Sequence, residues 1–444
     1  MHPGVSQALA AGTRFVRVVW TDNANVIRAK AVHAGALADF ATHGVGITAA
    51  QQALPVMSDA VVPGGGLGPV GEIRLVPDWD TLTPLPYAPG HARVMGDMVL
   101  DGKPWDLCPR SFLKRVLADA GRDGFQVSAA FENEFYLVRP RPDGGFDPAD
   151  DTVFAATLAM DRLRPVIDDL AEALLAQRMP VELYYPESGP GQHEIAIRYS
   201  SAVEAADRQV AFRETTHAVA DRHGLKASFL PKVFEGKAGS GCHLHFSLWK
   251  DGKNVFPDPA GPGGLSAVAR AFLAGVLGHL PGLAAIVAPT PNSYRRLQPR
   301  FWAGAYRCWG VDNREAAIRV PSSPSGKGSA HFEVKTVDAS ANPYLALGAA
   351  VAAGLDGIRR KLDPGPPVQS DPAGLSDADR AQRRIDPLPA SAADALARLE
   401  ADRLLTDALG PGLATAYRAV RRAEAEALGG LSLEDEVRLL LERY

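Results

Sequence analysis

The first forty residues alternate between apolar and polar positions in the way that strands do. Residues 14–20 and 26–32 each show this period of two, and Asp22-Asn23-Ala24-Asn25 between them are residues that favour a turn. The pattern predicts a β-hairpin, and residues 36–40 after it are expected to form a short helix. This order of elements predicts a small α+β domain that ends near residue 105.

A second apolar run, residues 129–138, contains two carboxylates within a predicted strand. Because side chains alternate faces along a strand, Glu132 and Glu134 point the same way, while Phe131 and Phe135 crowd around them. Burial of two like charges costs several kcal/mol unless a positive group lies between them, and a divalent cation is the simplest candidate. On a half-exposed strand the same pattern is also typical of a face that contacts water.

Polar residues share one face in three further predicted strands. They are His243, His245 and Ser247 in residues 239–248, Glu187 and Glu194 around a Gly/Pro-rich turn, and Glu333 with Lys335 in residues 331–335. Each of these alone is explained equally well by a hydrogen-bonded histidine or an edge-strand charge. Together the four strands predict a funnel of inward-facing oxygen ligands with one imidazole, which favours Mg²⁺ or Mn²⁺ over zinc.

Arginines form the other half of the predicted site. Arg296 lies in residues 292–297, and Arg314 and Arg319 lie in residues 312–319, with apolar neighbours around Arg319. The planar guanidinium donates two parallel hydrogen bonds to phosphate or carboxylate and stays charged. Divalent metals with arginines are typical of phosphoryl transfer, although a solvated arginine-rich face is the alternative.

These motifs, in this order, resemble those of glutamine synthetases, from residue 15 to about residue 440. The matching residues are Glu132 and Glu134; Glu187 with Gly191-Gln192-His193-Glu194; Gly239-Ser240-Gly241-Cys242-His243-Leu244-His245; Asn292-Ser293-Tyr294-Arg295-Arg296; Asn313-Arg314 with Arg319; and Glu333 with Lys335, followed by Asn342-Pro343-Tyr344-Leu345. The resemblance implies an α+β fold with a small β-grasp-like domain in residues 1–105. It implies a larger catalytic domain in residues 106–444, with a curved antiparallel sheet flanked by helices.

The resemblance also implies roles for individual residues. It assigns Glu134, Glu187 and Glu194 to one metal; Glu132, His243 and Glu333 to a second; His245, Ser247, Tyr199, Arg314 and Arg319 to ATP; Gly239, Arg296 and Lys335 to glutamate; and Arg296, Arg314 and Arg319 to catalysis. The implied reaction is phosphorylation of the γ-carboxylate of glutamate by ATP, followed by displacement of phosphate by an amine. Phosphorylation divides one difficult step into two easier ones.

The chain departs from the family pattern where ammonia would bind. An acid of the flap (residues 300–305) is replaced by Trp302, and an acid contributed by the N-terminal domain is replaced by Thr48. Lys335 stands in place of an arginine, and Ala238 in place of an asparagine. We therefore expect an organic amine as the substrate, with Trp302 in its binding site. The alternatives are a glutamine synthetase with an unconventional ammonia site and a catalytically silent paralogue; the silent paralogue is disfavoured because all six metal ligands are present.

The composition of the chain does not indicate a function, but it limits the number of domains, the partners and the compartment. The 444 residues exceed one ordinary core, and the net charge of -4 argues against a nucleic-acid surface. Three cysteines without a CxxC pair fit a reducing cytoplasm, and the first residues lack a signal peptide. The most apolar run, residues 271–289, is expected to be broken by His279 and Pro281 and therefore not to span a membrane. The resemblance implies a double-ring homo-oligomer in which the neighbour's N-terminal domain completes each active site.

Overall fold

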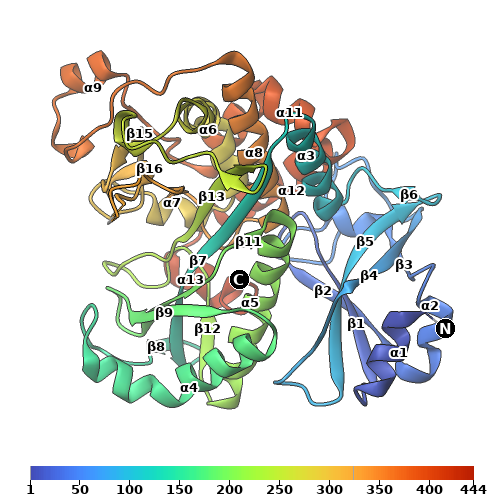
Figure 1. Ribbon diagram of the computed structural model, residues 1–444. Coiled ribbons are helices and arrows are strands. Elements are labelled where there is room, and N and C mark those ends of the chain that lie inside the picture. The colour runs from blue at the N-terminus through green and yellow to red at the C-terminus, as the bar shows by residue number, and fades with distance from the viewer. Residues whose placement is uncertain (1, 324) are drawn as a thin grey trace.

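The computed structural model describes residues 2–323 and 325–444, and its strands form two sheets (Figure 1). The N-terminal sheet has the strand order β2-β1-β5-β4-β3, with β6 beside β5. Strands β1 and β5 are parallel, and the other pairs are antiparallel. Its elements are α1 (Pro3–Ala10), β1 (Phe15–Thr21), β2 (Ile27–His33), η1 (Ala34–Ala36), α2 (Leu37–Phe40), β3 (Val45–Thr48), η2 (Ala49–Ala53), β4 (Glu72–Pro84), β5 (His91–Leu100) and β6 (Lys103–Pro104).

The predicted hairpin and short helix are confirmed. Strands β1 and β2 pair from Phe15 opposite His33 to Thr21 opposite Ile27. In the turn, Asn25 has a φ of 63°, which asparagine tolerates better than most residues. The Asp22 carboxylate accepts a hydrogen bond of 2.9 Å from the backbone N–H of Val26 and closes the turn. The alternating apolar side chains of this sheet form a core of their own with α1 and α2.

The second sheet holds the motifs singled out above. Its strand order is β18-β15-β16-β17-β13-β7-β10-β9, with β8, β11 and β12 beside β7 and β14 beside β13. Its strands are β7 (Gln126–Pro140), β8 (Phe146–Pro148), β9 (Val181–Pro186), β10 (Gln192–Ile197), β11 (Ser200–Ser201), β12 (Lys226–Ser228), β13 (Cys242–Lys250), β14 (Lys253–Asn254), β15 (Tyr306–Val311), β16 (Ala316–Val320), β17 (Phe332–Val334) and β18 (Asp386–Pro387).

The sheet departs from the predicted antiparallel arrangement at one pair, since β15 and β16 are parallel. Residues 312–315 carry the chain back, so that Ala316 pairs with Tyr306 at the start of β15. All other pairs in this sheet are antiparallel. The α+β fold class is confirmed, whereas the division of the chain at residue 105 stays a prediction.

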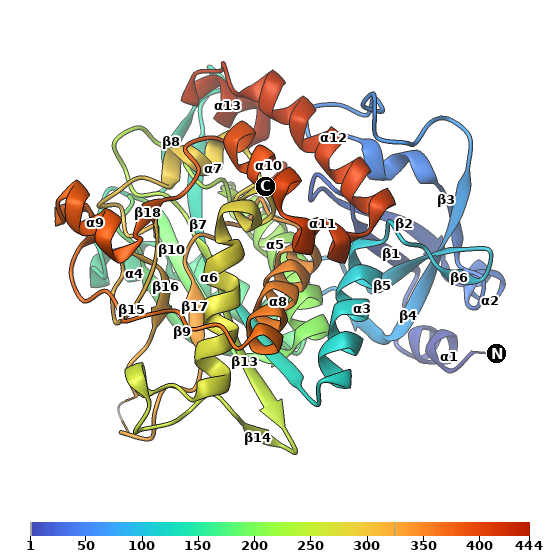
Figure 2. The same ribbon diagram turned by 90° about the horizontal axis from the view of Figure 1, so that it is seen from above.

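Helices cover this sheet, and α6 and α8 pack against each other on one side of it, in front of the strands in Figure 2. A Cβ on Gly275 of α6 would collide with the Ala353 carbonyl of α8, so the absence of a side chain permits the close approach. The helices after the first sheet are α3 (Pro109–Arg122), α4 (Thr157–Ala176), α5 (Ala202–Arg222), η3 (Pro262–Gly264), α6 (Ala267–Val287), α7 (Pro291–Arg296), α8 (Pro343–Arg360), η4 (Pro372–Gly374), α9 (Asp377–Arg383), α10 (Ala392–Ala401), α11 (Arg403–Leu409), α12 (Pro411–Leu428) and α13 (Leu433–Leu440).

Helix α6 is long and apolar enough to meet the length and composition criteria for a membrane span. His279 and Pro281 do not interrupt it, contrary to what their positions suggested. However, 72% of its apolar window is buried inside the fold, as in the core helix of a globular protein. Its hydrophobicity is therefore explained by packing.

The hairpin turn of the N-terminal sheet is fastened to the rest of the chain. The Asn342 side chain, which caps α8, donates to the Thr21 hydroxyl at 3.0 Å and to the Asp22 carbonyl at 2.9 Å. Asn25 donates to the Ala339 carbonyl at 3.0 Å, and the Tyr444 hydroxyl donates to the Ala24 carbonyl at 2.8 Å. These contacts join the N-terminal sheet to the start of α8 and to Tyr444 through buried polar groups.

Candidate active site

Three carboxylates converge at one end of the second sheet. Glu134 of β7 pairs with Glu194 of β10, and Glu187 follows directly after β9. One oxygen from each lies within 4.8 Å of the others. Burial and the neighbouring acids raise the pKa of Glu194 to about 9 and that of Glu187 to about 7. Three oxygen donors that repel one another suit a hard divalent cation, as predicted for this trio.

A second cluster lies further along the same face and contains Glu132, His245 and Glu333. His245 of β13 pairs with Glu333 of β17, and its Nε2 lies 3.1 Å from Glu132 and 3.2 Å from Glu333. Within the described residues, neither carboxylate oxygen of Glu333 has a hydrogen-bond partner of good geometry, although both are buried. His245 and Arg319 lie near these oxygens without donating a well-directed hydrogen bond, so the carboxylate keeps lone pairs that fit a bound cation.

The charges of this second cluster balance one another. Burial alone would raise the pKa of Glu132, but its contacts with His243 and His245 hold it well below its usual value. Burial likewise opposes the charge of Glu333, but Lys335 and His245 lower its pKa. Burial would lower the pKa of His245, but the two carboxylates raise it to about 10. The two carboxylates therefore favour the protonated form of the imidazole that lies between them.

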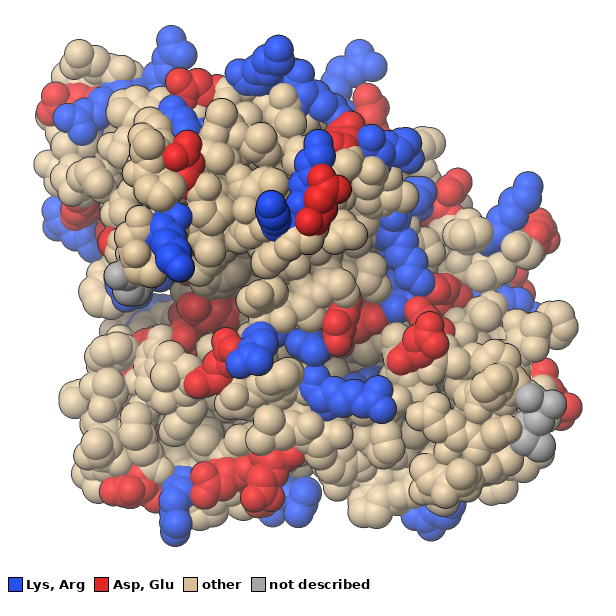
Figure 3. All heavy atoms as spheres, viewed as in Figure 1, with Lys and Arg blue, Asp and Glu red and all other residues tan. Residues whose placement is uncertain are grey.

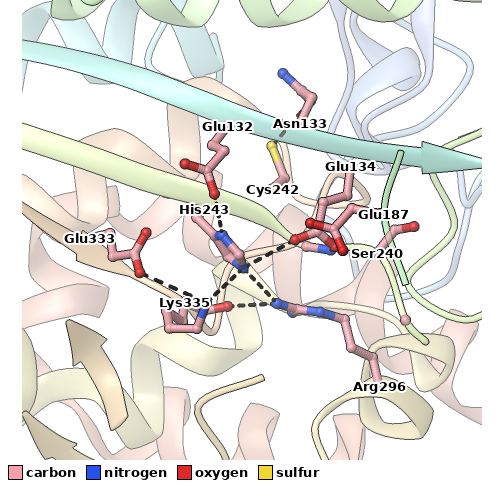
Figure 4. A network of polar contacts seen from close by, with 12 residues as sticks. Glu132, Asn133, Glu134, Glu187, Ser240, Cys242, His243, Arg296, Glu333 and Lys335 are labelled. Carbon is pink, nitrogen blue, oxygen red and sulfur yellow. Dashed lines mark hydrogen bonds and ion pairs between the residues drawn. The ribbon is translucent and has the colours of Figure 1, made fainter. Parts of the chain in front are cut away.

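His243 lies between the two clusters, and its assignment to the second metal stays a prediction (Figure 4). Its Nδ1 is 2.9 Å from Glu132, and its Nε2 is 3.7 Å from Glu134. Arg296 and Lys335 also approach Nε2, at 3.5 and 3.4 Å. The pairing of β13 with β17 places His245, two residues further along β13, opposite Glu333.

The residues predicted to bind glutamate lie beside the first cluster. Arg296 is buried and donates to the carbonyls of Lys335 and Thr336 at 2.7 and 3.3 Å. A Cβ on Gly239 would lie 2.6 Å from the Pro231 carbonyl oxygen and 2.7 Å from the Arg296 side chain, so only glycine fits. These residues and the three carboxylates line one cavity of about 460 Å³. In Figure 3 acidic side chains are visible inside the hollow at the left of the molecule.

A neighbouring cavity of about 330 Å³ collects three of the five residues predicted to bind the nucleotide. Tyr199, His245 and Ser247 all line it, together with Trp249. The rings of Tyr199 and Trp249 are nearly parallel, at 25° and 6.5 Å between centroids, and the Trp249 indole N–H donates to Ser247 at 3.0 Å. Glu132 lines both cavities, so a ligand that spans them passes the carboxylates.

Comparison with known proteins identifies the family to which the chain belongs. The model of the glutamine synthetase catalytic domain matches residues 106–439, and that of the glutamine synthetase N-terminal domain matches residues 4–105.

The chain belongs to the glutamine synthetase family.

It is an ATP-dependent carbon–nitrogen ligase, and the family in general depends on divalent metals.

Named relatives differ in what they are called. The chain is 39% identical to gamma-glutamylpolyamine synthetase GlnA3 of Streptomyces coelicolor, over 95% of this chain and 91% of that protein. It is 36% identical to type-1 glutamine synthetase 1 of Dictyostelium discoideum, over 97% and 90% of the two chains. The solved structure of a GmaS/ADP complex superposes with a TM-score of 0.86 at 33% identity and covers both chains fully.

The two arginines assigned to the phosphoryl group lie on different sides of the glutamine synthetase-like site. Arg314 lines the larger cavity, and its guanidinium carbon lies 5.8 Å from the centroid of the Trp302 ring. Arg319 of β16 lies opposite Glu333, with its Nε 3.0 Å from the carboxylate. Arg319 thus borders the second acidic cluster, whereas Arg314 borders the flap.

Of the two replaced acids, Trp302 and Thr48, only the position of Trp302 lines the larger cavity of this chain. The Trp302 indole lines the larger cavity and is 56% exposed, so it does not pack away beneath the flap. Thr48 ends β3 in the N-terminal sheet, is exposed, and accepts a hydrogen bond of 3.3 Å from Ala50. Thr48 ends a strand of the N-terminal sheet, whereas Trp302 lies in the loop between α7 and β15, and Thr48 is not among the described residues that line the cavity of Trp302.

Sequence reasoning missed three aromatic residues: Trp249, which lines the smaller cavity, and Tyr185 and Phe154, which line the larger one. Trp249 continues the alternating face of His243, His245 and Ser247, so the period of two already indicated it. Tyr185 pairs with Glu194 across β9 and β10, and burial together with Glu194 raises its pKa. Phe154 contacts Tyr185 edge to face at 5.9 Å and also lines the larger cavity. Phe154 carries no sequence signal of its own, because it lies in a loop far from every motif.

Proposed function

We propose that this glutamine synthetase family ligase joins the γ-carboxylate of glutamate to an organic amine and forms a γ-glutamyl amide. The observation that carries the proposal is the Trp302 indole, which lines the same cavity as Glu134, Glu187 and Glu194. An apolar ring in the place of an acid offers little attraction to a small, strongly hydrated ammonium ion. It suits the alkyl or aryl part of a larger amine, with a cation–π contact worth about 0.5–2 kcal/mol while the amine is protonated.

The proposed reaction has two balanced steps. An oxygen of the γ-carboxylate attacks the terminal phosphorus of ATP, the bond from that phosphorus to the bridging oxygen breaks, and ADP leaves. The neutral amine nitrogen then attacks the acyl carbon, the bond to the phosphate oxygen breaks, and phosphate leaves while the nitrogen loses a proton. Phosphorylation is necessary because a carboxylate is a poor electrophile with a poor leaving group.

We assign this chain's residues to the steps as follows. Arg296, Lys335 and the backbone at Gly239 hold glutamate beside the first acidic cluster. Tyr199 and Trp249 hold the base of ATP, while His245 and Ser247 lie along the nucleotide. Arg314 and Arg319 neutralise the phosphoryl group as it transfers, which positioned guanidinium groups do well.

Two divalent cations complete the proposed site, and oxygen-rich ligation favours Mg²⁺ or Mn²⁺. Glu134, Glu187 and Glu194 would hold the first of them. Glu132 and Glu333 would hold the second, with His243 as the imidazole ligand, because its Nδ1 lies 2.9 Å from Glu132. When bound, the metals supply neutralisation of the phosphate charge.

The remaining parts of the proposal concern assembly and location. We infer a double-ring homo-oligomer in which the neighbour's N-terminal domain, residues 1–105, brings Thr48 to the active site. Thr48 is exposed and available for such a contact. We place the enzyme in the cytoplasm, where ATP is available and its three cysteines, all buried and unpaired, stay reduced.

The test is a panel of amines with saturating Mg²⁺, ATP and glutamate. Methylamine, n-butylamine, benzylamine, putrescine and spermidine are compared with ammonium chloride by phosphate release. At least one amine should exceed ammonia in kcat/KM. Trp302→Glu should shift the amine-to-ammonia ratio at least tenfold toward ammonia, whereas Trp302→Phe, the matched control, should preserve the preference. If ammonia exceeds every amine, the enzyme is a glutamine synthetase and the proposal fails.

A further inference from the structure

A buried glutamate lies directly beneath the flap. Glu315, in the turn between β15 and β16, is 8% exposed, and its two carboxylate oxygens accept hydrogen bonds from two different residues of the flap. The backbone N–H of Trp302 donates to Oε1 at 2.9 Å, and that of Arg300 donates to Oε2 at 3.1 Å. One carboxylate therefore fixes two alternate residues of the flap at once.

The flap needs such support because its backbone conformation is unfavourable. Arg300 and Trp302 have φ values of 66° and 55°, in the left-handed region that residues with a side chain seldom adopt. Such conformations persist only where the surroundings enforce them. The two bonds from these same residues to Glu315 are charge-assisted and therefore strong.

Glu315 is itself held in place. Its backbone N–H donates to the Asn313 side chain at 3.0 Å, and the Asn313 amide donates to the carbonyls of Val368 and Ser370 at 2.8 and 3.1 Å. Arg314, between these two residues, places its guanidinium over the Trp302 ring at 5.8 Å. The turn at residues 313–315 thus contacts Trp302 twice: Glu315 accepts a hydrogen bond from its backbone N–H, and Arg314 lies over its indole ring.

We propose that Glu315 is a positioning residue for amine specificity, which holds the flap so that the Trp302 indole forms a fixed wall of the amine site. The inference rests on the proposed function, because it takes Trp302 as the residue that meets the amine. Glu315 lies beneath the flap and does not line the cavity, so it acts through Trp302. A fixed wall binds a larger amine without ordering the flap first, whereas ammonia gains nothing from it.

The test measures the amine-to-ammonia ratio of kcat/KM for the full-length enzyme with the same panel. Glu315→Gln can accept at most one of the two bonds, since its amide nitrogen is a donor. It should raise KM for the best panel amine about tenfold and lower the ratio about tenfold, with KM for ATP and glutamate within about threefold. Asp312→Asn is the matched control: Asp312 lies in the same turn and accepts from Ser322 at 3.0 Å instead of from the flap, and its ratio should not change.

A double-mutant cycle separates positioning from general support of the fold. On a Trp302→Ala background, Glu315→Gln should leave the ratio unchanged, because the wall is already gone. An equal loss on both backgrounds, or an unchanged ratio in Glu315→Gln alone, would overturn the inference. Glu315→Asp, a milder change, replaces Glu315→Gln if that variant does not fold.

A second measurement does not depend on turnover. The fluorescence contribution of Trp302, obtained by difference from Trp302→Phe, should be quenched by acrylamide about twice as strongly in Glu315→Gln as in the parent. Equal quenching would refute the positioning role whatever the amine. If instead the parent prefers ammonia but quenching still increases, the proposed function fails and the positioning of Trp302 by Glu315 stands.

Discussion

Substitution of Glu194 by glutamine should make the metal-free protein more stable while it abolishes metal-dependent activity. Glu194 lies with Glu134 and Glu187 in a cluster of three carboxylates within 4.8 Å of one another. Without a cation these groups repel one another, so the protein carries an electrostatic cost that a bound metal or a bound proton relieves. An amide of the same shape removes one charge and with it much of the repulsion.

The magnitude follows from the pKa of Glu194, which burial and then Glu132 and Glu134 raise from 4.5 to about 9. Because the folded-state pKa lies above the unfolded value, the stability contribution is full below pH 4.5 and is lost as the pH rises toward 9. At about pH 7.5 the loss is about 4 kcal/mol, at about 1.36 kcal/mol per pH unit above 4.5. The neighbouring carboxylates share the proton, so only part of this loss belongs to Glu194 itself. We therefore expect Glu194→Gln to raise the free energy of unfolding by about 2 kcal/mol.

The assay is urea unfolding between about pH 5 and pH 8.5, in chelator and again with Mg²⁺ or Mn²⁺. In chelator, Glu194→Gln should match the parent near pH 5 and exceed it near pH 7.5; with metal, the parent should gain more stability than the variant. Glu172→Gln removes an exposed carboxylate of α4 and is the control for net charge. If Glu194→Gln is less stable than the parent at every pH in chelator, the three carboxylates do not repel one another as argued.

Three further predictions concern the same site, acid stability and assembly. Glu134→Ala or Glu333→Ala should abolish ATP-dependent turnover, since each removes a charge that offsets metal and phosphate; near-normal phosphate release from either would contradict the metal assignment. His217 of α5, whose pKa is lowered to about 4 first by burial and then by Arg213, contributes stability that is present above pH 6.5 and is lost as the pH falls through about 4. Between about pH 7 and pH 4 the free energy of unfolding, measured with urea, should therefore fall by about 2–3 kcal/mol less in His217→Gln than in the parent. Light scattering alongside an activity assay should find active enzyme only as an oligomer, and an active monomer would refute completion of the site by Thr48.

The sequence by itself determined the elements and the faces of the site. The period of two in β7 puts Glu132 and Glu134 on one side of a strand, and the same period in β13 aligns His243, His245 and Ser247. These relations are local, since a side chain's face follows from its position along its own strand. For the same reason the hairpin at Asp22 was predictable from fewer than twenty residues.

Only the tertiary structure decided which of these faces meet and in which register. The register of β13 against β17 places His245 rather than His243 opposite Glu333, and no local pattern specifies it. The direction of Trp302 likewise depends on Glu315, thirteen residues later, which holds two residues in a backbone conformation they do not favour. Strand pairing and loop direction are set by contacts between distant segments, which form only when the whole core is buried. The sequence therefore predicts the chemistry available to this site, and the packing of the chain determines its geometry.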